Sequence, residues 1–505
     1  MSDPNLLHVM TPDGRRTLQP SDAQRAMRLT ELLRIKSMPL NIRCGQRGLC
    51  DGCLVHLQAG RLEHVETGEP VEAGEQPTEL RACQYRLSDA GGEVVIDVPH
   101  RSILGHAPQI EIDFRINVPR AHEPLVQDPA TPLGVAIDIG TTTVALLLVE
   151  MQTGEIIARA SGFNKQMNLG DDVLTRINLC LYDKQKIGEL QREVVNNTIE
   201  PLLTEALASV ERDVAEIGCI TVAANTTMLH LLAGADPSPM GMVPFTPAFT
   251  EHRVIRAGEI GMTVLPRGDA VQVHLLPSGA AYVGADLIAG AFATGLAWDE
   301  GPTLLVDVGT NGEIILKTKD HLLGCATAAG PAFEGGGLRS GIRAGEGAIS
   351  KIRIQGDPAE IDATVIGDTK PIGLCGSAYI DFLAQASRAG LLSETGRFVR
   401  GKIDHLLLDP AAEHLAIHFG RNGQKDKSVV IIETDVASLL QAKAAIAAGT
   451  LTLLEHAGMT PGDVKQLYLA GGFGVHLDHH SAIHSGLLPG FTREQLQVVG
   501  NTSLA

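Results

Sequence analysis

The chain of 505 residues is long enough for several domains, and its 44% hydrophobic and 20% charged residues are typical of a globular protein. Its net charge of −18 argues against a nucleic-acid partner, because an acidic chain cannot neutralise a phosphate backbone in bulk. The sequence has no run of 18 or more apolar residues and no secretory pattern near residue 1, so we expect no membrane partner and a cytoplasmic location.

The first hundred residues predict a small α+β unit. LLHVMTPDGRRTLQP predicts two short strands around a turn at Asp13 and Gly14. SDAQRAMRLTELLRIKSM predicts an amphipathic helix with Ser21 or Asp22 as its N-cap. A cysteine-rich loop follows, and after it CLVHLQAGRLEHV and GEVVIDVP predict further strands.

Four cysteines in this unit have the spacing of a cluster site. Cys44, Cys50 and Cys53 lie on one glycine-rich loop, with five and two residues between them, and Cys83 follows after 29 more. Three thiolates on one loop and a fourth from a neighbouring segment can hold an iron–sulfur cluster. Structural zinc sites usually pair two Cys-x-x-Cys knuckles, and only one is present, so the pattern favours iron and sulfur.

This arrangement resembles the [2Fe–2S] ferredoxins that have five residues between their first two ligands. The resemblance implies a β-grasp-like ferredoxin domain over residues 1–99, with a [2Fe–2S] cluster on the four cysteines. Gln46 departs from that family, since many of these loops have another glycine there. We expect this change to alter the hydrogen bonding around the cluster and to leave its ligands intact.

The remaining chain predicts a linker followed by α/β architecture. Residues 100–132 are proline-rich with weak periodicity, which predicts an extended linker. From residue 133, apolar strands that end in Gly/Thr turns alternate with Ala- and Leu-rich helices. We assign a middle domain, the first lobe segment with its phosphate-binding hairpin, to residues 133–216 and a C-terminal domain to residues 217–505.

Two predicted turns have the same Asp-x-Gly-Thr pattern. AIDIGTTT and LVDVGTNG each place an aspartate, Asp138 or Asp307, just before a glycine turn between strands. Backbone N–H groups and hydroxyls in such a turn can bind phosphate oxygens, and the aspartate can hold Mg²⁺ directly or through water. The predicted phosphate-binding residues are Gly140, Thr141, Thr142, Thr143, Gly309, Thr310, Asn311 and Gly312.

Two further features accompany these turns. Glu313 follows the second turn and is a candidate to orient a water molecule or the metal shell, although it is equally an ordinary strand-end carboxylate. LYLAGGFGVHLD predicts a strand that ends at paired glycines, Gly471 and Gly472, against which a nucleotide can lie. We therefore assign Asp138, Asp307 and Glu313 as catalytic and the glycines as nucleotide-binding.

The three motifs together resemble the actin/hexokinase/Hsp70 (ASKHA) ATPase superfamily. That resemblance implies two ribonuclease-H-like lobes over about residues 133–500, each a mixed five-stranded sheet flanked by helices, which close on ATP and Mg²⁺. The fold class expected for the whole chain is therefore a β-grasp-like α+β domain, a linker and an α/β two-lobed ATPase.

The combination of both halves resembles the reductive activators of corrinoid proteins. The match extends to NLGDDVLTRI, AANTTMLHLLAG, CATAAGPAFEGG, LCGSAYIDFLA and DVASLLQAKAAIAAG. It implies an ATP-hydrolysing protein that passes one electron from its cluster to inactive cob(II)alamin on a corrinoid methyl-carrier protein and restores cob(I)alamin. It also implies an upstream electron donor and a homodimer.

Three other functions stay open on the residues alone. One is an ASKHA small-molecule kinase with a redox-sensing ferredoxin domain. Another is an ATP-driven electron donor to a non-corrinoid enzyme, as in the activators of 2-hydroxyacyl-CoA dehydratases, which hold a [4Fe–4S] cluster between subunits. The third is a redox-gated binding protein in which the nucleotide is structural.

Overall fold

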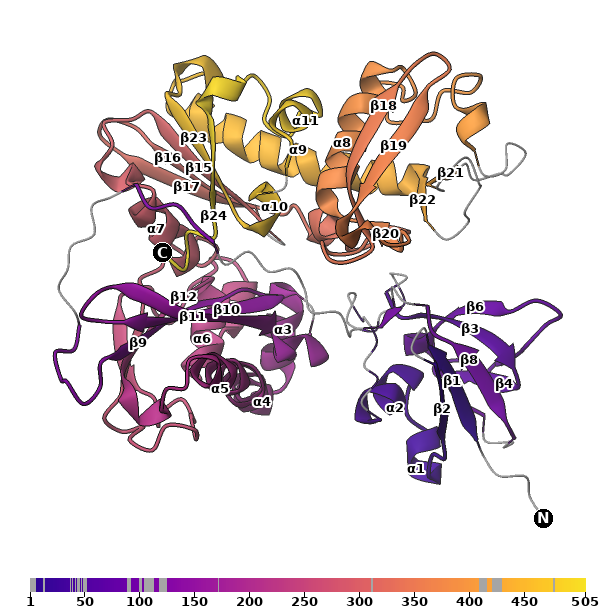
Figure 1. Cartoon of the computed structure of the whole chain (residues 1–505), viewed down its shortest axis with the longest axis horizontal. Coiled ribbons are helices and arrows are strands. Elements are labelled where there is room, and N and C mark those ends of the chain that lie inside the picture. Colours follow the sequence, from indigo (N-terminus) through magenta and orange to yellow (C-terminus); the bar gives the residue numbers. More distant parts are fainter. Residues whose placement is uncertain are drawn as a thin grey trace. The chain divides into compact units, whose positions relative to one another are not determined.

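The computed structural model (Figure 1) divides into two compact units. The first contains residues 1–107, 334–379 and 389–438, and the second contains residues 108–333, 380–388 and 439–505. The residues that the structure describes are 6–11, 14–36, 38, 40, 42, 46, 48, 52–88, 92–99, 102–103, 113–117, 125–170, 172–309, 312–407, 416–419, 429–475 and 477–505.

The N-terminal part of the first unit is built on a five-stranded sheet in the order β2-β1-β8-β3-β6. A smaller sheet has the order β5-β4-β7. The predicted hairpin and the strands predicted on both sides of the cysteine region are confirmed. The strands are β1 (Leu7–Thr11), β2 (Gly14–Leu18), β3 (Leu54–Ala59), β4 (Arg61–His64), β5 (Pro70–Glu72), β6 (Thr78–Arg81), β7 (Tyr85–Leu87) and β8 (Val94–Asp97).

The helix predicted after Ser21 is divided into two short helices. Ser21 caps α1 (Asp22–Arg25), and α2 (Leu29–Ile35) follows after a break. At the break Arg28 forms an isolated bridge with Arg86 on the neighbouring strand. This tertiary contact overrides a periodicity that is helical throughout, and α2 keeps its predicted apolar face in the core.

The rest of the first unit contains short strands and the starts of two helices. A three-stranded sheet has the order β19-β18-β20, and β21 pairs with β22. Both α8 and α9 begin in this unit and continue into the second. The elements are β18 (Ala348–Gln355), β19 (Glu360–Val365), β20 (Gly373–Leu374), α8 (Gly376–Arg388), β21 (Ala416–His418), β22 (Val430–Ile432) and α9 (Glu433–His456).

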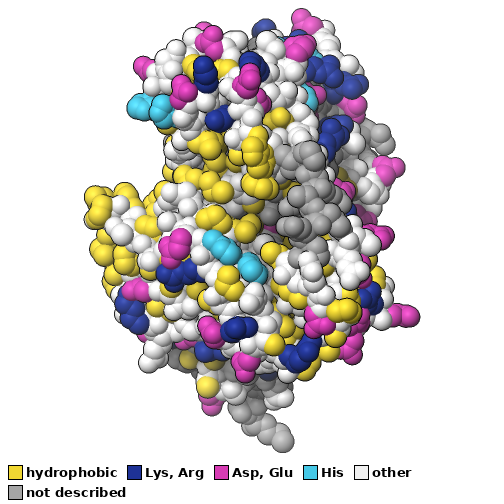
Figure 2. Space-filling model, turned by 90° about the vertical axis from the view of Figure 1, so that its left-hand side faces the viewer, with side chains coloured by type: hydrophobic (Ala, Val, Ile, Leu, Met, Phe, Trp, Pro, Cys, Tyr) yellow, Lys and Arg dark blue, Asp and Glu magenta, His cyan; other side chains and the backbone are white. Residues whose placement is uncertain are grey.

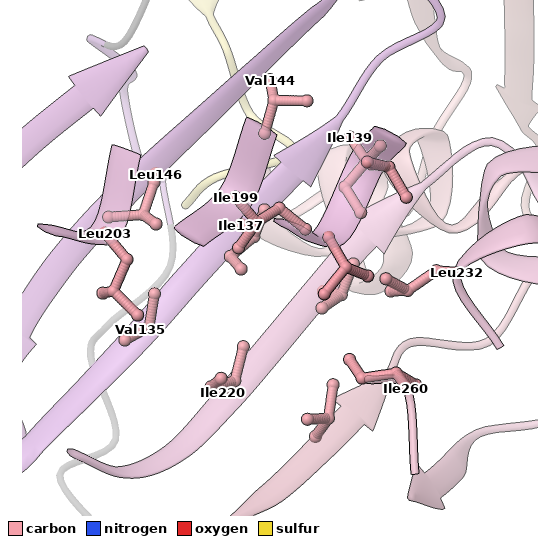
Figure 3. Close-up of a cluster of buried hydrophobic side chains, with 14 of the residues drawn as sticks. Val135, Ile137, Ile139, Val144, Leu146, Ile199, Leu203, Ile220, Leu232 and Ile260 are labelled. Atoms are coloured by element: carbon pink, nitrogen blue, oxygen red, sulfur yellow. The ribbon is translucent and has the colours of Figure 1, made fainter. Parts of the chain in front are cut away.

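The first sheet of the second unit has the order β11-β10-β9-β12-β14-β13. On β9, Val135, Ile137 and Ile139 are buried on one face, and Figure 3 shows them beside Ile199 and Leu203 of the covering helices. The elements are β9 (Leu133–Ile139), β10 (Thr143–Glu150), β11 (Glu155–Phe163), α3 (Val173–Tyr182), α4 (Gln185–Val194), α5 (Glu200–Ser209), β12 (Ile217–Ala224), α6 (Thr226–Leu232), β13 (Arg253–Arg256) and β14 (Gln272–Leu275).

The second sheet of this unit has the order β17-β16-β15-β23-β24. Each sheet has a central strand that pairs antiparallel with the next strand and parallel with a later one, β9 with β10 and β12, and β15 with β16 and β23. The two sheets thus repeat one topology, as the resemblance implies, but the prediction of five strands in each is wrong for the first sheet, which has a sixth strand, β13, at its edge. The elements are α7 (Ala285–Ala293), β15 (Thr303–Val308), β16 (Gly312–Lys317), β17 (Leu322–Thr327), β23 (Gln466–Ala470), α10 (Gly472–Val475), α11 (His479–His484) and β24 (Leu496–Gly500).

Two predicted boundaries can be compared with these sheets. The division between residues 216 and 217 falls inside the first sheet, because β12 pairs in parallel with β9. Within the predicted linker, residues 113–117 are not a free spacer, since Phe114 bridges Gly500 and the backbone N–H of Arg115 donates to the carbonyl of Val499 at 2.9 Å. This part of the linker is therefore bound to the folded unit.

The helix α9 is long and apolar enough, by length and composition alone, to cross a membrane. In the structure it packs on the second sheet. A Cβ atom at Gly449 would lie 2.4 Å from Cγ2 of Thr327, and one at Gly312 would lie 3.0 Å from the side chain of Ile446. Glycines on both surfaces therefore allow the helix and the sheet to approach closely.

Charged groups of both signs are mixed on the face shown in Figure 2. Lys and Arg side chains are interspersed there with Asp and Glu, and hydrophobic side chains gather between them.

The contact at Gly449 predicts the effect of adding one methyl group. Gly449→Ala should lower the melting temperature of the chain, because the new Cβ has no room against Thr327. Gly188→Ala is the matched control: Gly188 is also helical, in α4, and a Cβ there meets only the end of the Arg192 side chain at 3.8 Å. It should leave the melting temperature unchanged or raise it, since alanine favours a helix by about 1 kcal/mol over glycine. Equal effects of the two substitutions in a thermal melt would contradict the close packing of α9.

Candidate functional site

The first predicted phosphate-binding turn joins β9 to β10. Ile139 pairs with Val144 across the hairpin, and the backbone N–H of Gly140 donates to the carbonyl of Thr143 at 2.9 Å. A Cβ atom at residue 140 would lie 2.8 Å from that same carbonyl oxygen, so the turn requires glycine. Thr141 and Thr142, which follow it, are buried.

Polar side chains from three separate segments, two of them fully buried and that of Asn225 half-buried, hold this turn. Asn164 Nδ2 donates to the carbonyl of Gly140 at 2.9 Å, and Asn225 Nδ2 donates to Thr141 Oγ1 at 3.2 Å. The guanidinium of Arg176 donates to the carbonyl of Thr141 and is fully buried. A buried cation is stable only when such acceptors surround it, so the turn and its support are specified together.

These supporting residues were not assigned roles from the sequence. Arg176 lies within NLGDDVLTRI and Asn225 within AANTTMLHLLAG, two stretches that the resemblance to activators singled out. The structure supplies their function, since Asn225 also caps α6 by accepting from the backbone N–H of Met228 at 3.0 Å. For Asn225 the signal available in the sequence was that a polar residue follows an apolar strand, whereas Arg176 lies within α3 and had no such signal.

The second predicted turn joins β15 to β16. Asp307 pairs with Glu313 and Val308 with Gly312, so the two acidic side chains lie on the same face of neighbouring strands. Gly309 follows β15 as predicted, whereas Thr310 and Asn311 lie outside the described residues. The hairpin therefore places Glu313 beside Asp307, as a role in the metal shell requires.

The paired glycines lie against this second turn. Gly471 follows β23 with φ of +85°, and a Cβ atom there would lie 2.6 Å from Oδ1 of Asp307. Only glycine tolerates both that backbone conformation and that approach. Gly472 begins α10 directly after it. The structure thus brings the predicted Gly-Gly motif to Asp307, the aspartate that precedes the second predicted phosphate-binding turn.

A third carboxylate, which sequence analysis missed, joins the two aspartates. Asp286 is the second residue of α7, and its Oδ1 accepts from the backbone N–H of Leu287 at 2.8 Å. A Cβ atom at Gly284 would lie 2.3 Å from that oxygen and 2.5 Å from Cα of Asn225, so glycine allows the helix to start here. In the sequence, Asp286 looks like any acidic residue in the first turn of a helix.

Burial disfavours the ionisation of all three carboxyl groups, and neighbouring carboxylates add to the effect for Asp138 and Asp307. Burial raises the pKa of Asp138 to about 7, and the charges of Asp286 and Asp307 add to that increase. Burial likewise raises the pKa of Asp307 to about 7, with a further contribution from Asp286, and the pKa of Asp286 to about 6. Each side chain keeps a solvent-accessible part. Such mutual repulsion is relieved when a cation occupies the site.

The site does not form a preassembled cage for a metal ion. Among the described residues, no group of three or more His, Cys, Asp or Glu side chains is arranged to ligate one ion. This agrees with the chemistry of Mg²⁺, which usually keeps several waters and uses one or two carboxylates together with substrate phosphates. The residues present therefore fit Mg²⁺ that arrives with a nucleotide.

The last strand supplies one more contact to the site. Asn501, directly after β24, donates from Nδ2 to Oδ2 of Asp138 at 2.8 Å, and this hydrogen bond lowers the pKa of Asp138 against the effect of burial. Sequence analysis did not identify Asn501, because its partner lies 363 residues away. Its amide fixes one oxygen of the carboxylate in position.

The described cysteines of the predicted cluster site come together in the first unit. Leu54 of β3 pairs with Arg81 of β6, which brings Cys53, before β3, level with the residues after β6. Cys83 lies just beyond that strand end, and both cysteines are buried. Cys44 and Cys50 lie outside the described residues. The prediction that the distant Cys83 approaches the cysteine loop is thus supported for Cys53.

The glutamine that departs from the ferredoxin pattern takes a glycine-like conformation. Gln46 has φ of +63°, and its side chain accepts from Thr30 Oγ1 at 2.9 Å. Gln84 Nε2 donates to the carbonyl of Gln46 at 3.0 Å and lies 3.4 Å from Sγ of Cys83. The left-handed backbone explains why glycine is common at this position, and the hydrogen bonds hold glutamine there instead.

Comparisons with protein families match most of the chain. Residues 133–299 match the model described as the RACo middle region, and residues 301–505 match the C-terminal domain of RACo, the ASKHA domain. The two matched regions contain every residue of the carboxylate site described above.

Individual relatives are similar over most of their length. The corrinoid activation enzyme RamQ of Eubacterium limosum is 28% identical over 92% of this chain and 86% of its own. A reductase of Methanosarcina barkeri, named for a Co(II) methylated amine-specific corrinoid protein, is 26% identical over 74% of this chain and 68% of its own. A solved structure named as a reductive activator for corrinoid, iron–sulfur protein has 28% identity and a TM-score of 0.66, over 99% of this chain and 91% of its own.

The raised pKa of Asp307 predicts how stability depends on pH. The folded chain holds this proton up to about pH 7, whereas the unfolded chain loses it near pH 4, so ionisation of Asp307 reduces stability as the pH rises through that range. Asp307→Asn should therefore raise the melting temperature of the ligand-free chain by several degrees more at pH 8 than at pH 5.

Asp463 provides a control of opposite sign. Hydrogen bonds from Thr460 lower its pKa, so it is ionised at both pH values. Asp463→Asn should lower the melting temperature by the same amount at pH 5 and pH 8. If Asp307→Asn also lowered the melting temperature equally at pH 5 and pH 8, the inference that burial raises the pKa of Asp307 would be wrong.

Proposed function

The chain belongs to the RACo family of reductive activators of corrinoid proteins, and from that membership we propose its mechanism, substrates and cofactors in detail. It is a corrinoid activation enzyme, a reductase of Co(II) corrinoid proteins. The proposal is that ATP binding and hydrolysis at the carboxylate site drive one electron from an N-terminal [2Fe–2S] cluster to cob(II)alamin on a corrinoid methyl-carrier protein. The product is cob(I)alamin, the form that accepts a methyl group.

One observation carries the nucleotide part of this proposal. Two equivalent hairpins of a duplicated topology place their aspartates, Asp138 and Asp307, close enough that the charge of Asp307 raises the pKa of Asp138. An Asp-x-Gly-Thr turn alone is common in hairpins, but two that meet at one buried site make a place for a group with several negative charges and its cation.

Each part of the site has a task in this mechanism. The turn after Asp138 offers backbone N–H groups and the hydroxyl of Thr141 to phosphate oxygens, and the buried Arg176 and Asn225 keep the turn rigid. Gly471 leaves room for the nucleotide beside Asp307. When Mg²⁺ is bound, Asp138 and Asp307 would hold it directly or through water, and it would supply charge neutralisation on the phosphates.

A carboxylate is also needed to orient the attacking water. Asp286 lies with the other two aspartates, and burial raises its pKa less than it raises theirs. It can therefore accept a hydrogen bond or a proton from water. Glu313 lies across from Asp307 and is the second candidate. We assign water orientation to Asp286 and a place in the metal shell to Glu313.

The cysteine site provides the electron carrier. Cys53 and Cys83, with Cys44 and Cys50, would hold the [2Fe–2S] cluster, which supplies one electron at a time. Burial of Cys53 and Cys83 and the hydrogen bonds of Gln84 in the loop are features that fit such a cluster. An upstream electron donor must reduce it, and a homodimer is the expected assembly.

The competing functions differ in the fate of phosphate and electrons. If the chain were a small-molecule kinase, Asp286 would act as the base for a hydroxyl group of a metabolite. Incubation with labelled ATP would then yield a phosphorylated metabolite, whereas the activator yields free phosphate. A dehydratase-type activator would show the electron paramagnetic resonance signal of a [4Fe–4S] cluster instead of a [2Fe–2S] cluster.

The direct test follows cobalt reduction. The reduced chain, prepared without oxygen, is mixed at substoichiometric amounts with a cob(II)alamin carrier protein, and cob(I)alamin is measured by its absorbance. We expect complete reduction only when ATP and Mg²⁺ are present, because ATP must drive an uphill electron transfer over repeated cycles. Equal reduction with and without ATP would contradict the proposed coupling.

Two substitutions should separate the two halves of the mechanism. Asp138→Asn should lower ATP-dependent cobalt reduction at least about 100-fold, because it removes a carboxylate that would hold Mg²⁺ at the phosphates, and leave the cluster spectrum unchanged. Cys83→Ser should remove or alter the cluster signal and leave nucleotide binding unchanged. The pair is measured by cluster absorbance, nucleotide titration and cobalt reduction. A loss of both properties in either soluble variant would mean that the sites are not separate.

A further inference from the structure

The segment Asp113–Asn117 pairs with the edge of the second sheet of the second unit. The backbone N–H of Arg115 donates to the carbonyl of Val499, and that of Asn501 donates to the carbonyl of Asp113, both at 2.9 Å. β24 is the last strand in the sheet order, so the segment covers groups that an open edge would expose.

Gly500 makes this pairing possible. It has φ of +77°, and a Cβ atom there would lie 2.2 Å from the carbonyl oxygen of Asp113 and 3.2 Å from Cα of Phe114. No side chain fits between the two backbones. A glycine next to Asn501 is therefore required by the docked segment, which indicates that this contact is built into the fold.

The docked segment also contacts the other elements that carry the aspartates. Phe114 packs in a small cluster with Leu504 and residues of the first sheet, including Ala136 on β9, the strand of Asp138. The backbone N–H of Asn117 donates to the carbonyl of Ala293 at 3.0 Å, at the end of α7, the helix that begins beside Asp286. Asp113 forms an ion pair with Arg159 of β11.

Asn501 makes both the contact with the site and the contact with the segment. Its side chain holds Oδ2 of Asp138 at 2.8 Å, and its backbone amide holds the carbonyl of Asp113 at 2.9 Å. We infer that Asn501 is a positioning residue that links the nucleotide site to the segment Asp113–Asn117. This inference rests on the proposed function, because it takes Asp138 as part of the ATP site.

The location of the segment in the chain gives this link its significance. In the chain, residues 113–117 lie between the cysteine-containing residues 1–99 and β9, the first strand of the second unit. When Mg²⁺ and nucleotide bind at Asp138, they change the energy of its hydrogen bond with Asn501. This in turn changes the stability of the docked segment. By linkage, a change in docking must then alter nucleotide affinity by the same factor.

The test measures hydrogen exchange of the backbone amides in residues 113–117 of the full chain, with and without Mg²⁺ and a non-hydrolysable ATP analogue. We expect the exchange rate to change at least about fivefold on nucleotide binding, the lower end of typical coupling between sites. Nucleotide binding with unchanged exchange would overturn this inference alone. Failure of the wild-type chain to bind nucleotide at all would overturn the proposed function and this inference with it.

Two variants show whether Asn501 carries the link. Asn501→Ala should abolish the nucleotide-dependent change in exchange and lower kcat for ATP hydrolysis at least about tenfold, with KM for ATP changed less than about threefold. Arg159→Ala is the control: it removes the ion pair to Asp113 but not the Asn501 contacts, so the response to nucleotide should persist. A normal response and kcat in Asn501→Ala would overturn the assignment. Should that variant not fold, the measurement on the wild-type chain decides.

Discussion

Three carboxylates in one enclosed site are the constraint on which this structure depends. Asp138, Asp286 and Asp307 each lose solvation, and the charge of Asp286 further opposes the ionisation of both other aspartates, so ionising all three in the ligand-free site is unfavourable. A structure keeps such a cluster only at a cost in stability, which is typical of functional sites. Among the described side chains, no group of three or more His, Cys, Asp or Glu residues is arranged to ligate one ion.

The surrounding fold holds these three carboxyl groups close together. The duplicated sheets present two equivalent turns, and glycines let neighbouring backbones approach the carboxylates, as at Gly471 beside Asp307 and Gly284 beside Asp286. Buried donors, among them Arg176 and Asn164, fix the first turn. Buried hydrogen bonds thus hold the first turn, whereas the contact of Asn501 with Asp138 lies at the edge of the site.

Sequence patterns predicted those parts of the molecule that depend on local chemistry. The apolar strands, the two aspartate turns and the Gly-Gly motif were visible because period, turn residues and spacing are local properties. Asp286 and Asn501 were missed because their roles arise only when distant segments meet. The break between α1 and α2 was missed for the same reason, since Arg28 pairs with a strand far along the chain.

The linker shows a different limit of prediction. Proline content and weak periodicity describe residues 113–117 correctly as extended, yet they cannot show that this extended segment pairs with β24. In the sequence, only Gly500 of β24 indicates the contact. A single glycine occurs for many structural reasons, so it does not predict this one. Edge pairing is set by backbone groups, which every sequence has in common.

The most direct test of the central claim is a calorimetric titration of the wild-type chain with an ATP analogue, once with Mg²⁺ and once with a chelator. The account predicts that binding is at least about tenfold tighter with Mg²⁺, because the nucleotide alone would add negative charge to a site that already contains three carboxyl groups. Equal affinity in both titrations would contradict it, since the carboxylates would then have no part in holding the nucleotide.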